Sequence, residues 1–181
     1  MKKTMIGAIA ITMAFFCGCT PTAEQINKTA TAIGYAAGLV ANQTKINDDA
    51  RNAVVSILNE VRSCVPSEGQ SFVDAWTPVI KAKVDELVSS GKIDSATGTL
   101  VSSVAIIAAK AVDYMFDIRF PKAKQYEELV RAGMSGALDG FLTVFKPVNH
   151  ADDNCEDCVA RGIAKKEYDQ EAFDWFKKNL K

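Results

Sequence analysis

The stretch that most constrains the fold of this chain is residues 95–109, in which none of the 15 residues is charged. Its composition is limited to Ser, Thr, Gly, Ala, Val, Leu and Ile, and five of its side chains carry hydroxyl groups. A helix that is apolar all around is buried inside a protein, and five hydroxyls in so short a stretch favour a core helix over a membrane helix. We therefore expect a central helix that is capped by Asp94 and runs to about Phe116.

Hydrophobic residues at helical spacing predict further helices on both sides of this central one. The first starts near Thr22, because Gln25 three residues later completes a capping-box pattern. The second is expected from Asn47 or Asp48 to about Cys64. The third is expected over residues 71–90, where Pro78 predicts a kink or a late start near Thr77 and Gly91 a left-handed cap. Two more are expected after the central helix, from Pro121 to about Phe145 and from about Lys165 to Leu180. No stretch alternates like a strand, so the expected fold class is all-α, a single-domain bundle of five to six helices.

Small residues crowd two of these predicted helices. In the first they are Gly34, Ala36, Gly38 and Ala41, and we expect tight packing within the chain there, with self-association of the helix as the alternative. In the fifth, Gly133, Gly136 and Gly140 follow one another at spacings of three and four residues. Each glycine costs a helix about 1 kcal/mol relative to alanine, so we expect close contact with the central helix to compensate.

The N-terminus has the pattern of an export signal. Two lysines, Lys2 and Lys3, are followed by an apolar run over residues 5–16, which is 12 residues long. As a helix this run would extend about 18 Å, whereas the hydrocarbon core of a membrane is about 30 Å thick. A run this short after a basic start is typical of a secretory signal rather than of a permanent membrane span.

The end of this signal, Phe16-Cys17-Gly18-Cys19, resembles the lipobox of bacterial lipoprotein precursors. Gly18 matches the small residue before the cleavage site and Cys19 matches the cysteine that receives the lipid, whereas Phe16 and Cys17 differ from the usual leucine and the usual alanine or serine. The resemblance implies a signal peptide of residues 1–18, a lipidated tether of residues 19–24 that anchors the chain to a membrane, and a helical domain of residues 25–181. No family is recognised for the helical domain.

The residue after Cys19 is Thr20 rather than an aspartate. In envelopes with two membranes, this pattern resembles that of lipoproteins forwarded to the outer membrane, and the domain would then face the periplasm. In an envelope with one membrane, the same anchor would hold the domain on the outer face of the plasma membrane. The resemblance therefore implies an exported, membrane-anchored protein in either envelope.

Charge and composition argue against a nucleic-acid partner and against catalysis. Of the 21 basic residues, 19 remain without Lys2 and Lys3, against 22 acidic residues, and no basic stripe stands out. The one histidine is His150, so any Ser/His/Asp or Cys/His set would have to use it, and no glycine-rich phosphate loop follows a strand. We therefore expect a protein that is not an enzyme and has no cofactor other than covalent lipid.

A polar stretch near the C-terminus contains His150, Cys155 and Cys158 among four acidic residues. Three interpretations fit this pattern. An exported location is oxidising and favours a disulfide, either Cys155 with Cys158 or one of them with Cys64. A zinc site of His150, Cys155 and Cys158 is the second interpretation, and it needs a fourth ligand. A redox-active thiol pair is the third, although the neighbouring acids disfavour an attacking thiolate.

The functional hypothesis from the sequence is a non-catalytic envelope lipoprotein that packs against or recruits another envelope protein. The first alternative is a metal- or thiol-responsive extracytoplasmic binding protein built on His150, Cys155 and Cys158. The second alternative is a carrier of a small apolar ligand, held in a cavity among the aromatic side chains of the bundle. These aromatic side chains occur at helical spacing and are expected to lie mostly in the core.

Overall fold

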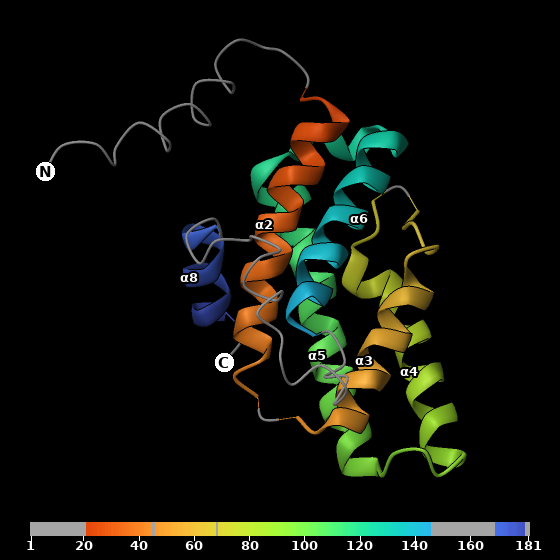
Figure 1. Ribbon diagram of the computed structural model, residues 1–181. Helices are drawn as coiled ribbons and strands as arrows, with labels where there is room; N and C mark the ends of the chain where they lie inside the picture. The colour runs from red at the N-terminus through yellow and green to blue at the C-terminus, as the bar shows by residue number, and fades with distance from the viewer. Residues whose placement is uncertain (1–20, 45, 68, 146–168, 180–181) are drawn as a thin grey trace, which may run out of the picture.

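The computed structural model describes residues 21–44, 46–67, 69–145 and 169–179 of the chain. All regular elements in these ranges are helical and pack into one bundle (Figure 1), which confirms the expected all-α fold class with six α-helices in the described part of the chain. In chain order the elements are α2 (Ala23–Ala41), α3 (Asp48–Val61), α4 (Phe72–Ser89), α5 (Ser95–Tyr114), the π-helix η1 (Met115–Arg119), the 3-10 helix η2 (Pro121–Gln125), α6 (Glu127–Val144) and α8 (Gln170–Asn179).

Three of these helices begin at the capping residues that the sequence predicts. The Thr22 hydroxyl accepts a hydrogen bond from the Gln25 amide at 3.2 Å, and the Gln25 side-chain oxygen accepts one from the Thr22 amide at 3.0 Å. This capping box starts α2 at Ala23, inside the residues assigned to the tether. Asn47 and Asp94 cap α3 and α5 in the same way, each accepting from the amide three residues on, at 2.8 and 2.6 Å.

The start of α4 differs from one of the two outcomes expected at Pro78. The helix begins at Phe72 and runs through Pro78, so a late start near Thr77 is wrong. The reason is that the first turn has its own hydrogen-bond acceptors: Ser71 accepts from the amide three residues on at 3.0 Å, and the Asp113 carboxylate of α5 accepts from the amides of Phe72 and Val73 at 2.7 and 3.1 Å. These acceptors satisfy amides that every helix leaves open at its start.

Other element boundaries agree with the sequence only in part. Gly91 has a φ of 71° and closes α4, as expected of a left-handed cap. Pro121 opens the short helix η2 rather than α6, which begins after Tyr126. The side chain of Tyr126 is 45% exposed. The last helix is described from Gln170, and its expected start near Lys165 lies outside the described residues.

The central position of α5 is confirmed, because this helix contacts α2, α3, α4 and α6. It is not buried on all sides, however. The side chains of Thr99 and Ser103 are exposed, and each hydroxyl donates to the backbone carbonyl four residues earlier, at 3.1 and 3.0 Å. By length and composition alone, residues 95–119 would suffice to cross a membrane. In the bundle, this segment supplies the helix around which the others pack.

Gly133 meets the side chains of Met115 and Phe116, at the expected end of the central helix, as well as Ile26 of α2. Gly136 and Gly140 of α6 meet α2 instead, which corrects the expected pairing for these two glycines. The two helices run side by side in the same direction (Figure 1). A Cβ added at Gly140 would lie 2.9 Å from the Tyr35 backbone nitrogen, and one at Gly34 would lie 2.7 Å from the Ala137 carbonyl carbon. The two backbones therefore touch, as they do in G-x-x-x-G helix pairs. This contact also confirms that the small residues of the first helix pack within the chain.

Large aromatic side chains of α4 and η1 pack together in the core. Phe72 meets Trp76 edge to face with ring centroids 5.4 Å apart, and it stacks on Phe116 at 5.9 Å. Trp76 is fully buried, and its indole nitrogen donates to the Cys64 carbonyl at 2.8 Å. These rings fill space by packing on one another, as expected from their helical spacing.

Candidate functional site

The residues that the sequence singles out for chemistry lie outside the described part of the chain. They are Cys19, His150, Cys155 and Cys158. The expected lipidation, the expected disulfide and the alternative zinc site therefore stay predictions. The structure does describe the residues next to these segments in the chain. Helix α2 begins shortly after Cys19, and Phe145 and Asp169 lie on either side of residues 146–168.

Cys64 is the one cysteine that the structure describes. It lies just after α3, is half-buried, and its sulfur is 4.0 Å from the Ser63 hydroxyl. Within the described ranges, no group of three or more His, Cys, Asp or Glu side chains is arranged to hold a metal ion. A metal site that uses Cys64 would thus need ligands from outside these ranges.

A shallow depression lies at the end of the bundle opposite the start of α2. Its lining residues come from the start of α3 and from the turn between α4 and α5, and they are Asn47, Asp49, Gly91, Lys92, Ile93, Asp94 and Thr97. Its volume is about 400 Å³, it is open to solvent, and its lining is polar and apolar in about equal parts. The carboxylate of Asp94 is already used as a helix cap, and the hydrogen bond from the Thr97 amide lowers the pKa of this group. The depression does not suit an apolar ligand, which prefers an enclosed hydrophobic pocket.

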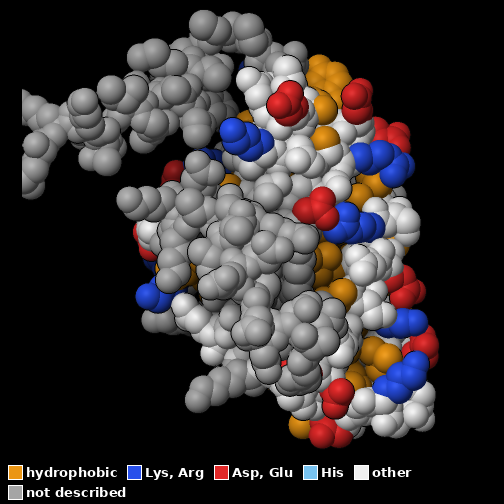
Figure 2. All heavy atoms as spheres, in the orientation of Figure 1, with side chains coloured by type: hydrophobic (Ala, Val, Ile, Leu, Met, Phe, Trp, Pro, Cys, Tyr) orange, Lys and Arg blue, Asp and Glu red, His pale blue; other side chains and the backbone are white. Residues whose placement is uncertain are grey.

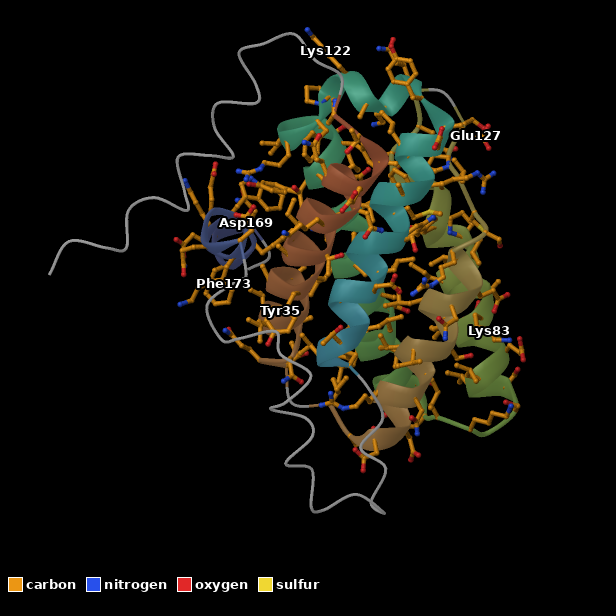
Figure 3. All side chains as sticks on the ribbon, turned by 45° about the horizontal axis from the view of Figure 1, so that its top comes forward. Tyr35, Lys83, Lys122, Glu127, Asp169 and Phe173 are labelled. Carbon is orange, nitrogen blue, oxygen red and sulfur yellow. The ribbon has the colours of Figure 1, made fainter. Side chains whose placement is uncertain are left out.

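The docking of α8 onto the bundle involves ion pairs between residues far apart in the sequence. Arg119 in η1 pairs with Asp169 at 3.0 Å and with Glu171 at 2.6 Å. Asp169 also accepts a hydrogen bond from the Ala172 amide at 2.9 Å, so one carboxylate caps α8 and ties it to η1. We define Arg119 with Asp169 and Glu171 as the clasp; Figure 3 labels Asp169 at the start of α8.

Aromatic packing completes this contact. The Tyr114 ring lies 4.9 Å from the Trp175 ring and 5.5 Å from the Phe176 ring, centroid to centroid, and Phe176 is fully buried. Burial raises the pKa of Tyr114 and by itself would lower that of Arg119. The carboxylates of Asp169 and Glu171 outweigh burial and raise the pKa of Arg119. The clasp is thus a charged contact at the edge of an apolar one.

Asp113 in α5 is a half-buried carboxylate. It joins α5 to the first turn of α4 through the two amides described above. Burial raises its pKa, while the hydrogen bonds from Phe72 and Val73 act in the opposite direction. Because both oxygens accept hydrogen bonds from the chain's own amides, this carboxylate has a structural role rather than that of a free acid or base.

The comparisons with known proteins return nothing for this chain: no family model, no curated protein and no solved structure matches it. The case for a function therefore has to come from the chain's own residues. Sequence reasoning missed both Asp113 and Arg119. A partial signal was present for Asp113, because it is the first acid after the uncharged stretch of the central helix. Nothing local linked Arg119 to acids 50 and 52 residues away.

Proposed function

We propose that this chain is an exported lipoprotein, anchored through lipid on Cys19, whose helical bundle has a structural or protein-binding role in the cell envelope and no catalytic one. The observation that carries the proposal is the signal of residues 1–18 that ends in Gly18-Cys19. The start of α2 is consistent with it, because the capping box at Thr22 begins the folded body three residues after the proposed anchor. The tether is then just long enough to join a lipid to the bundle.

Thr20 after the anchor favours the outer membrane in an envelope with two membranes. The bundle would then face the periplasm, and in an envelope with one membrane it would lie on the outer face of the plasma membrane. The proposed partner is another envelope protein. Acidic and basic side chains are interspersed on the face that Figure 2 shows, and such a surface gives no support for a nucleic-acid partner, which requires a basic patch.

Intact-mass measurement of the protein extracted from membranes tests this proposal. The expected mass lacks residues 1–18 and includes added acyl chains, because a single chain binds only reversibly and stable anchoring takes more than one. Cys19→Ser should stay unprocessed or be released from the membrane, with Cys17→Ser as the matched control that is processed normally. If Cys19→Ser fractionates with the membrane and has the same processed mass as the unaltered protein, the lipoprotein assignment is wrong.

A second candidate is a metal- or thiol-responsive binding protein, favoured by the spacing of His150, Cys155 and Cys158. Elemental analysis of the purified protein separates it from the first. Stoichiometric zinc or copper that is lost in Cys155→Ser but kept in Cys64→Ser would favour this candidate. A protein with no bound metal and a Cys155–Cys158 disulfide in peptide mapping would favour the structural role.

A further inference from the structure

Two large hydrophobic side chains are strongly exposed in the described part of the chain, and both belong to the same short region. Ile118 in η1 is 50% exposed, and Tyr126, directly before α6, is 45% exposed. Isolated exposed hydrophobics are common on proteins, so their exposure alone means little. Their position in the bundle gives them significance.

The region that carries them lies at the end of the bundle where α2 begins. The side chains of Ile26 in the first turn of α2, Met115 and Phe116 converge around Gly133. Figures 1 and 3 both place the start of α2 and the start of α6 at this same end, and Figure 3 shows Lys122 of η2 pointing outward there. We call the surface formed by η1, η2 and Tyr126 the anchor-side surface.

The covalent distance to the proposed lipid is short. Cys19 precedes the cap residue Thr22 by three residues, and an extended chain spans at most about 3.6 Å per residue. A lipid on Cys19 therefore keeps the start of α2 within about 11 Å of the membrane surface. The 19 residues of α2 extend about 28 Å from that point. The lipid holds only the start of this helix, so the bundle can either stand on this end or lie on its side.

We propose that the anchor-side surface rests on the lipid surface, with Ile118 and Tyr126 in the interfacial layer, so that the bundle stands on end. This inference rests on the proposed lipid at Cys19. Tyrosine is enriched at the interface of membranes because its ring is apolar and its hydroxyl is polar. Two side chains would not hold a free protein on a membrane, but the tether raises their effective concentration there, so even a weak contact orients the bundle.

Charge explains why the contact is apolar rather than electrostatic. Two of its three basic side chains are in ion pairs: Lys124 pairs with Asp117 at 2.9 Å, and Arg119 pairs with Asp169 at 3.0 Å and with Glu171 at 2.6 Å. The third, Lys122, is exposed, and so are Glu127 and Glu128 at the adjoining start of α6. A surface with such balanced charge gains little from anionic lipids, so the contact should form on zwitterionic vesicles and should not weaken as salt is added.

The full-length acylated protein in phosphatidylcholine vesicles, doped with a phospholipid that carries a photoactivatable diazirine, tests the proposal. Cross-linked peptides are mapped by mass spectrometry after flotation of the vesicles. We expect cross-links to concentrate on residues 118–126 and to be scarce on the distal turn around Lys92. In Ile118→Glu, cross-linking of residues 119–126 should fall about threefold, because a charged side chain is excluded from the apolar layer, while the matched variant Lys92→Glu should cross-link like the unaltered protein.

The outcomes separate this inference from the lipoprotein assignment. Vesicle-bound, acylated protein whose cross-links are confined to the tether, or are spread evenly over the bundle, would overturn the orientation and leave the assignment standing. Protein that lacks acyl mass and does not float with the vesicles would overturn both. Circular dichroism of Ile118→Glu checks that the bundle is intact, which is expected because the side chain is half exposed.

Discussion

The contact between the backbones of α2 and α6 allows a quantitative prediction for Gly140→Ala. The added Cβ would lie 2.8 Å from the Thr31 carbonyl carbon and 2.9 Å from the Tyr35 nitrogen, whereas carbon atoms in contact are about 3.5–4.0 Å apart. Backbone atoms of a packed helix cannot rotate out of the way as the end of a side chain can. The two helices must therefore separate by about 1 Å, and a gap of this size forfeits about a quarter to a half of the dispersion energy of each atom pair.

The expected loss of stability follows from this separation. About 50 atom pairs, as many as one buried leucine makes, contribute about 7.5 kcal/mol at about 0.15 kcal/mol each. Forfeiting a quarter to a half of this energy costs about 3 kcal/mol. Alanine regains about 1 kcal/mol because it forms helices better than glycine. The free energy of unfolding should therefore fall by about 2 kcal/mol, within the usual range for overpacked sites, and Tm should fall by about 4–8 °C for a chain of this length.

Urea and thermal unfolding, followed by far-UV circular dichroism, measure this change. Gly98→Ala is the matched control, because Gly98 is also a buried helical glycine, but the nearest neighbours of its added Cβ would be side-chain methyl groups, those of Val84 and Val88 at 3.0 Å and that of Ile93 at 3.9 Å. Those methyl groups can shift, so this variant should stay within about 1 kcal/mol of the unaltered protein. The reasoning fails if Gly140→Ala is as stable as Gly98→Ala, since the helices would then not be in backbone contact.

Two further predictions concern the carboxylates and the clasp. In Arg119→Gln, amide hydrogens of α8 should exchange faster while those of α5 keep their rates, because the ion pairs to Asp169 and Glu171 hold only α8. Hydrogen exchange measured by mass spectrometry checks this, and an α8 that exchanges at the same rate in the variant and in the unaltered protein would contradict it. Burial raises the pKa of Asp113 in the folded state. As pH rises, this carboxyl group therefore loses its proton at a lower pH in the unfolded chain than in the folded one. The free energy of unfolding should then fall as pH rises from the ordinary pKa of an aspartate through the raised one. Urea unfolding across this pH interval should show a smaller decline for Asp113→Asn, and an identical decline would count against burial as the dominant effect.

Much of the fold could be predicted from the sequence because its signals are local. The caps at Thr22, Asn47 and Asp94 and the left-handed Gly91 each depend on residues within one turn of the chain, and all four are confirmed. The same holds for the fold class, since hydrophobic periodicity reports the local conformation of each segment. The candidate site was predicted on Cys19 and on the His150–Cys158 stretch, which lie outside the described residues, so those assignments stay predictions.

By itself, then, the sequence determined where α2, α3 and α5 start and that the helices form an all-α bundle, together with the signal pattern at Cys19. Only the tertiary structure decided which helices meet. Gly136 and Gly140 of α6 are explained by α2, although the apolar character of the central helix favoured it as their partner. Asp113 caps a helix that starts 41 residues earlier, and Arg119 clasps acids 50 and 52 residues later. Such partners cannot be read from periodicity, because it shows that a face is buried but not which surface covers it.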